Sequence, residues 1–251
     1  MSLPVTYSHH VFAPHTWRAL MQHGPSAEFL SRRQELAETG VFLLLIMPSM
    51  ALSFLAVGQG RLPFSLAAVA TVLRDVGLVA LILLLLSRDR QTVAAIGWVR
   101  RGAGREIAWG IVLSAPVLVG MSALAAALRA AGLSGPRSSA SGLLPAPTPG
   151  EVLLAVALVA VVAVAEETIF RGYLILRFAS VLRSRPWAVV LSSAVFSVGH
   201  GYEGGAGVLT VGTTGLVFAV VYLWRRSLLA PIVMHFSVDL VGIVLVPLLP
   251  R

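Results

Sequence analysis

Three short sequences, each within a different apolar stretch, place carboxylate, imidazole and guanidinium groups at helical spacing. They are Glu166-Glu167-Thr168-Ile169-Phe170-Arg171, Phe196-Ser197-Val198-Gly199-His200 and His235-Phe236-Ser237-Val238-Asp239. Residues four apart share one face of a helix, so each sequence can present its polar groups in one direction. Carboxylates and imidazoles are the side chains that most often activate water as general bases. The three sequences are therefore candidates for one hydrolytic site.

The two adjacent glutamates are predicted to differ in their surroundings. Glu167 and Arg171 are four residues apart, so they can form an ion pair on one helix face. Glu166 is rotated by about 100° around the helix, which leaves its carboxylate free. A free carboxylate beside a neutralised one can serve as a general base. The alternative is a structural salt bridge at the end of a helix.

Two histidines and one aspartate complete the candidate set. Phe196 and His200 are four residues apart, and so are His235 and Asp239. Asp239 can orient the imidazole of His235, or both side chains can bind a metal ion. The alternative for either histidine is a structural hydrogen bond in the interior of a helical bundle.

The chain that carries these residues has the composition of an integral membrane protein. Of its 251 residues, 57% are hydrophobic and 12% are charged, whereas about a quarter of a soluble domain is charged. All 19 basic residues are arginine, and they lie in short clusters between apolar stretches, as in cytoplasmic loops of membrane proteins. We therefore expect no nucleic-acid partner. The absence of cysteine excludes disulfides, thiolate metal ligands and a cysteine nucleophile.

We expect an all-α transmembrane bundle of about seven spans, with six to eight allowed. A spanning helix needs about 20 mostly apolar residues, and such stretches lie near 41–58, 64–86, 107–128, 151–170, 187–203, 206–224 and 228–249. Residues 1–40 are predicted to be a polar arm, amphipathic near 29–36, and residues 41–250 the membrane domain. The catalytic core is predicted at 151–242, preceded by an exposed loop at 129–150 that is rich in Ser, Gly and Pro.

The arginines predict the orientation of the chain. If the N-terminus is cytoplasmic, 14 arginines, including Arg171 and Arg177, lie on the cytoplasmic side and 4 on the other, with Arg74 inside a span. This bias predicts a cytoplasmic N-terminus. Glu166 then lies about 22 Å from the outer start of its span, in the inner half of the membrane. The two histidines and Asp239 fall at similar depths, so we expect a shared site in a cavity open to the cytoplasm.

In order and spacing, the three sequences resemble the motifs EExxxR, FxxxH and HxxxN or HxxxD of the CPBP family. These are the CAAX-protease and bacteriocin-processing membrane proteases, also called Abi proteins, and the resemblance covers about residues 151–242. It implies an intramembrane endopeptidase in which Glu166 activates water with help from His200, while His235 and residue 239 complete the site. We accordingly expect a peptide or protein substrate, contact with membrane lipid, and a location in a bacterial plasma membrane.

Family members have been described both as metalloproteases and as metal-free glutamate-dependent proteases. A divalent metal such as zinc, held by Glu166, His200, His235 and Asp239, is therefore an alternative. In the CAAX-processing branch position 239 would be Asn, which can donate a hydrogen bond to a developing oxyanion. An ionised Asp239 can only accept. It would be protonated, orient His235 or bind a metal, and we favour the last two roles.

Other functions remain compatible with the sequence. The intramembrane Glu, Asp and His could line the proton or ion path of a transporter, although the sequence shows no paired halves. A catalytically silent immunity-type protein and a hydrolase of lipid amides or esters are further alternatives. Arg74 and Asp75, inside the second span, are expected to form a structural ion pair. The sequence predicts neither the substrate, nor its prenylation, nor the oligomeric state.

Overall fold

The computed structural model describes residues 32–59, 63–100, 102–135 and 144–249, and all regular secondary structure in these ranges is helical. This confirms the predicted all-α bundle. The helices are α2 (Arg32–Gln59), α3 (Phe64–Arg88), α4 (Ala103–Ala130), α5 (Pro149–Glu166), α6 (Ile175–Leu182), α7 (Arg185–Val198), α8 (Gly204–Arg225) and α9 (Leu229–Asp239). Residues 1–31, which hold most of the predicted polar arm, lie outside the described residues.

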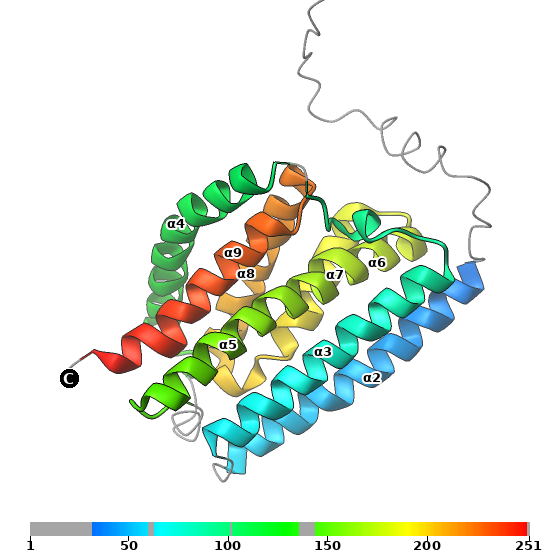
Figure 1. Ribbon diagram of the computed structural model, residues 1–251. Coiled ribbons are helices and arrows are strands. Elements are labelled where there is room, and N and C mark those ends of the chain that lie inside the picture. Colours follow the sequence, from blue (N-terminus) through cyan, green and yellow to red (C-terminus); the bar gives the residue numbers. More distant parts are fainter. Residues whose placement is uncertain (1–31, 60–62, 101, 136–143, 250–251) are drawn as a thin grey trace, which may run out of the picture.

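The helices lie side by side as a bundle (Figure 1), with α2 and α3 on one flank and α4 on the other. The helices that carry the three motifs are enclosed between these flanks, because α5 packs on α3 and α9 packs on α4. Each of the predicted spans overlaps a helix. Within the described residues, five segments are long and apolar enough to cross a membrane: Phe64–Arg88, Ala103–Ala130, Pro149–Leu182, Gly201–Arg225 and Leu229–Leu248.

The predicted end of the fourth span near residue 170 is wrong. The helix continues from α5 through a wide-turn π segment, η3 (Glu167–Leu174), into α6. Arg171 and Arg177, predicted on the cytoplasmic side, each lie inside the protein with 1% exposure. Arg177 pairs with Asp89, and its guanidinium lies 5.1 Å from the centre of the Tyr173 ring. Such partners allow a buried arginine to extend the helix beyond the apolar stretch.

The predicted span 187–203 is also shorter than expected. Helix α7 has 14 residues and ends at Val198, so it is about 21 Å long, less than the roughly 30 Å hydrocarbon core of a bilayer. The chain then turns at His200 through a 3₁₀ segment, η4 (Gly201–Glu203), into α8. Gly204 makes this turn with a φ of +76°, and an added Cβ would meet the Gly135 carbonyl oxygen at 2.2 Å. His200 is therefore held by a turn inside the bundle.

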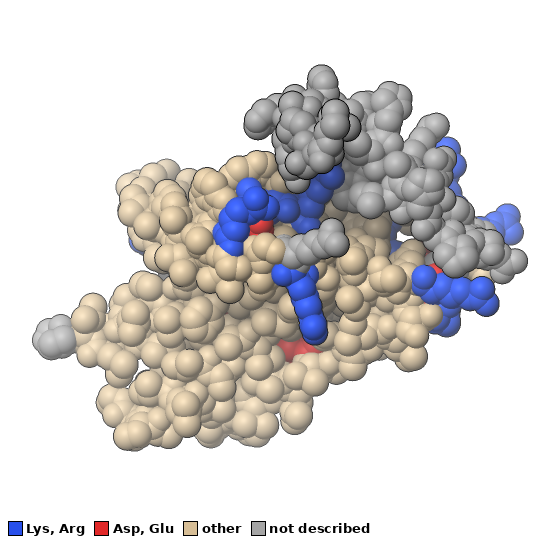
Figure 2. Space-filling model, turned by 45° about the horizontal axis from the view of Figure 1, so that its top comes forward, with Lys and Arg blue, Asp and Glu red and all other residues tan. Residues whose placement is uncertain are grey.

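Most arginines of the bundle gather at one end. The arginines lie where α2 begins and where α3, α6 and α8 end, while most of the visible surface is uncharged (Figure 2). The uncharged surface includes strongly exposed side chains such as Leu44, Leu84 and Val119. Exposed leucines and valines without charged neighbours are typical of a lipid-facing surface. The chain is thus an integral membrane protein with an arginine-rich end.

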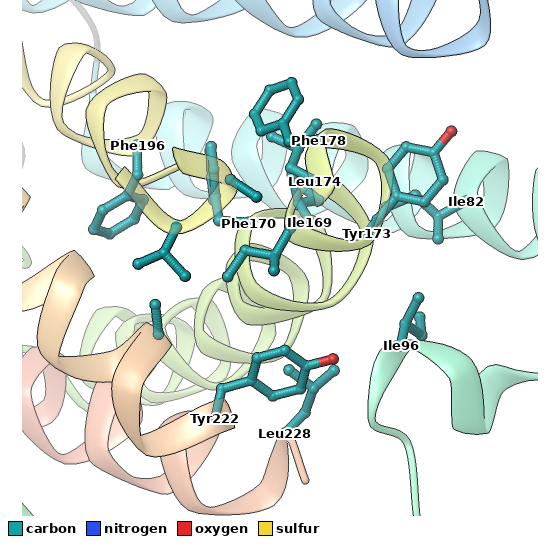
Figure 3. Close-up of a cluster of buried hydrophobic side chains, with 14 of the residues drawn as sticks. Ile82, Ile96, Ile169, Phe170, Tyr173, Leu174, Phe178, Phe196, Tyr222 and Leu228 are labelled. Carbon is teal, nitrogen blue, oxygen red and sulfur yellow. The ribbon is translucent and has the colours of Figure 1, made fainter. Parts of the chain in front are cut away.

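A short loop closes the arginine-rich end beneath the motif helices. The 3₁₀ segment η1 (Val93–Ile96) inserts fully buried Ile96 beside Tyr222 and Leu228 (Figure 3). The Leu228 amide donates a hydrogen bond of 3.0 Å to the Gly97 carbonyl, and Trp98 Nε1 donates one of 3.1 Å to the Thr168 hydroxyl. The loop thereby fixes η3, next to the adjacent glutamates.

Helices α4 and α9 approach so closely at Gly110 that a methyl group should not fit. An added Cβ would lie 2.5 Å from Val233 Cβ and 2.8 Å from the Ala230 carbonyl oxygen. We expect Gly110→Ala to destabilise the protein by about 1–3 kcal/mol through overpacking. Gly120→Ala, on the same helix with no atom within 4 Å, should be neutral or stabilising. Thermal unfolding in detergent compares the two, and equal stabilities would contradict the close packing.

Candidate active site

Glu167 is the buried centre of the site. Its side chain is 0% exposed, and its Oε1 accepts a hydrogen bond of 2.8 Å from Arg171 Nη1. The same oxygen lies 2.8 Å from His235 Nδ1; because an ionised carboxylate only accepts, the imidazole donates. The predicted pair with Arg171 is confirmed. The sequence did not predict that Glu167 also holds His235 and so ties η3 to α9.

Arg171 is enclosed by aromatic rings. Its guanidinium carbon lies 4.3 Å from the Phe196 ring centre and 5.4 Å from that of Phe218. The Phe196 ring also packs against Phe170 at 5.0 Å. Cation–π contact and the ion pair with Glu167 together stabilise a guanidinium with no access to solvent. Arg171 therefore neutralises Glu167 and is out of reach of a substrate.

Glu166 keeps a free carboxylate, as predicted. Its Oε2 lies 3.7 Å from His235 Nε2 and has no hydrogen-bond partner among the described residues. Asp239 Oδ2 lies 3.3 Å from the same nitrogen. His235 thus brings Glu166, Glu167 and Asp239 together from two helical segments. Glu166 and Asp239 are 15% and 22% exposed, whereas Glu167 is completely enclosed.

Both accessible carboxylates stand where an α-helix changes into a wider π segment. Glu166 is the last residue of α5 before η3, and Asp239 is the last residue of α9 before η5 (Leu240–Leu245). A wide turn is frequent at functional sites because it changes the direction in which neighbouring side chains point. Glu166 and Glu167 consequently reach different surroundings although they are adjacent.

His200 reaches the same region from the turn after α7. Its Nδ1 lies 3.0 Å from the Phe196 carbonyl oxygen; because a carbonyl only accepts, Nδ1 carries the hydrogen and Nε2 of the neutral ring carries a lone pair. The His200 ring packs on Phe196 at 4.8 Å, and Phe196 meets His235 at 6.1 Å. The two histidines therefore contact the same aromatic ring. No contact between His200 and Glu166 is present among the described residues.

Four further polar residues lie at this site, and the sequence did not assign them to it. The charge of Glu203 interacts with those of His200, Asp239 and Glu166, and the Tyr202 ring lies 5.9 Å from His200. Arg74 and Asp75 of α3 are joined by a contact of 2.8 Å, which confirms the predicted ion pair. The signals were present: a tyrosine and a glutamate directly follow His200 in the glycine-flanked turn, and a charged pair interrupts an apolar span.

The side chains around the site differ in exposure. On the arginine-rich side of Glu166, residues 167 to 174 are all buried, and the loop with Ile96 lies beyond them. Exposure of the side chains rises in the opposite direction, towards Asp239 and the turn after α7. The predicted cavity that opens to the cytoplasm stays a prediction.

The predicted metal ligands can be tested against this geometry. In residues 32–59, 63–100, 102–135 and 144–249, no three His, Cys, Asp or Glu side chains converge as a set that could hold a metal ion. Both nitrogens of His235 face carboxylates. The side-chain arrangement therefore does not fit the four-residue metal centre, and metal dependence stays a prediction.

Residues 148–241 match the protein family described as type II CAAX prenyl endopeptidase Rce1-like. We call residues 148–241 the Rce1-like region. The match includes all six predicted site residues and confirms the resemblance to the CAAX-protease family. Comparison with curated proteins found no match, and neither did comparison with solved structures. The Rce1-like region runs from just before α5 to the start of η5, so it coincides with the helices that form the site.

Proposed function

We propose that the Rce1-like region is an intramembrane endopeptidase in which Glu166 activates the attacking water. One observation carries the proposal: Glu166 has a carboxylate oxygen without a hydrogen-bond partner among the described residues, 3.7 Å from His235 Nε2, on a side chain that is 15% exposed. The His235 ring is itself fixed through Nδ1 by the buried pair of Glu167 and Arg171. A base next to an oriented imidazole is the arrangement that general acid–base hydrolysis requires.

In the proposed reaction Glu166 takes up one proton and later gives it away. Glu166 takes a proton from water, the water oxygen attacks the carbonyl carbon, and an oxyanion forms. The carbon–nitrogen bond then breaks, and the protonated Glu166 gives its proton to the leaving nitrogen. The lone pair on His200 Nε2 accepts a hydrogen bond from the water and positions it. Asp239 holds the Nε2 side of His235 at 3.3 Å, which agrees with an orienting role.

The substrate class is tested by product analysis. The name of the family suggests a farnesylated peptide that ends in a CAAX sequence as the first probe; an unmodified single-span peptide is the second. Both are incubated with the purified protein in proteoliposomes, and peptides and lipids are then analysed by mass spectrometry. We expect a peptide cut at one bond and unchanged lipids. Intact peptides with hydrolysed lipids would replace the protease by a lipid hydrolase.

The depth of Glu166 in the helix bundle bears on where cleavage occurs. Glu166 lies about 25 Å along the helix from Pro149, and His235 lies about 9 Å from the start of α9 at the arginine-rich end. If that end is cytoplasmic, as the arginine bias predicts, the bond is cut within the cytoplasmic half of the membrane.

His200→Ala is expected to lower kcat for the cleaved peptide by about 100-fold, because the water loses its second acceptor. His200 lies in a turn and is only half-buried, so the unfolding temperature should change little. Steady-state kinetics and thermal unfolding in the same detergent measure both effects. Unchanged kcat in a folded variant would remove His200 from the reaction.

A further inference from the structure

Arg74 and Asp75 of α3 form an ion pair inside the membrane bundle, and the proposed reaction has not used it. Arg74 Nε donates to Asp75 Oδ1 at 2.8 Å, and Nη2 lies at the same distance from that oxygen. Asp75 is 1% exposed, while the Arg74 side chain is 29% exposed. Asp75 thus anchors the guanidinium of a side chain that stays partly exposed.

The packing of α3 on α5 places this pair next to Glu166. Ala68 shares a small buried cluster with Ala155, and the two helices pack side by side in the same direction. Asp75 lies seven residues beyond Ala68 and Glu166 eleven residues beyond Ala155, a difference in level of about one turn, roughly 6 Å. In agreement, the charge of Arg74 acts on Glu166, and the charges of Glu166 and His235 act on Asp75.

The site otherwise offers few donors for an oxyanion. When it is ionised, Asp239 can accept hydrogen bonds but cannot donate them. Nε2 of His235 already lies 3.3 Å from Asp239 Oδ2. The Nδ1 hydrogen of His200 is used by the Phe196 carbonyl. Arg171 is enclosed by Glu167 and two aromatic rings. Of the two arginines whose charges act on Glu166, Arg171 is enclosed, whereas Arg74 is partly exposed.

We propose that Arg74, held by Asp75, is a catalytic residue that donates hydrogen bonds to the oxyanion formed when Glu166-activated water attacks the peptide carbonyl. The inference rests on the proposed endopeptidase function. The oxyanion forms when water oxygen bonds to the carbonyl carbon and the carbonyl electron pair moves to its oxygen. The guanidinium stabilises that charge without giving up a proton. Its hydrogen bonds to the oxygen weaken when the carbon–nitrogen bond breaks and the carbonyl forms again. Asp75 is a positioning residue.

The test compares steady-state kinetics of Arg74→Gln, Arg74→Lys and Asp75→Asn with those of the wild type, using the cleaved peptide in proteoliposomes. Arg74→Gln should lower kcat by about 100-fold, the effect of losing one oxyanion donor, with KM changed less than about 3-fold because the ground state lacks the charge. Arg74→Lys should retain part of the activity. Guanidinium ion added to Arg74→Ala should restore cleavage, a rescue that a purely structural role would not give.

Three controls separate the outcomes. Arg129→Gln removes an exposed arginine at the end of α4 and should leave kcat unchanged. Glu166→Gln tests the proposed function itself. If Glu166→Gln is inactive and Arg74→Gln keeps wild-type kcat, the role of Arg74 is overturned while the protease stands. If Glu166→Gln is active, both fall. If Arg74→Gln raises only KM, and only for a peptide with a free C-terminal carboxylate rather than an amide, Arg74 binds that carboxylate and the oxyanion role is overturned.

Discussion

Glu166→Gln is expected to lower kcat for peptide cleavage by about 1000-fold, the largest effect on activity of any single substitution. Glutamine has nearly the same shape as glutamate but cannot take the proton of water. Glu166 Oε2 makes no hydrogen bond with the described residues, so the substitution removes no hydrogen bond of that oxygen. Its effect should therefore appear in kcat and not in stability.

A glutamate on the same helix provides the matched control. Glu151 lies at the opposite end of α5, where its carboxylate accepts a hydrogen bond of 2.6 Å from the Ala146 amide. Glu151→Gln keeps an acceptor oxygen and should show wild-type kinetics. Cleavage by both variants at the wild-type rate would show that Glu166 is not the base. Loss of activity in both would indicate damage to α5 rather than to the reaction.

Glu167→Gln is expected to destabilise the protein by about 3–5 kcal/mol, the usual effect of removing one partner from a buried ion pair. The substitution would leave the Arg171 guanidinium inside the bundle without its counter-charge. It would also weaken the hydrogen bond that fixes His235. Thermal unfolding in detergent measures the loss, which should appear as lower yield of folded protein and a lower unfolding temperature.

A double variant identifies the cause of that loss. In Glu167→Gln with Arg171→Met, the uncompensated charge is gone, and the methionine can pack against Phe196 and Phe218, the rings that now contact the guanidinium. The double variant should be more stable than Glu167→Gln alone and still inactive, because the hydrogen bond that fixes His235 stays weakened. A single variant as stable as the wild type would show that the pair is not buried.

The helical bundle and the choice of site residues could be predicted because both depend on local patterns. Apolar stretches of spanning length are visible in the sequence, and the spacing of Glu167 and Arg171 predicts their ion pair directly. The same helical geometry predicted that the Glu166 carboxylate does not pair with Arg171. These features need no knowledge of how distant segments pack.

The contacts that define the site depend on distant segments, and for that reason they were missed. Nothing near His235 shows that Glu167, 68 positions away, holds its ring. The π segment after Glu166 has the same residue types as an ordinary helix. The early end of α7 depends on the turn at Gly204, which packs against a distant segment of the chain. In that contact the Gly205 amide donates a hydrogen bond of 2.9 Å to the Ser134 hydroxyl. Only the folded chain shows that Arg74 and Asp75 belong to the site.

Hydrolysis in ¹⁸O-labelled water tests most directly whether Glu166 activates water for peptide cleavage. Wild-type protein in proteoliposomes should release a peptide whose new carboxyl group carries one ¹⁸O, and Glu166→Gln protein of equal stability should release almost none. Labelled product formed by the glutamine variant at the wild-type rate would contradict the account.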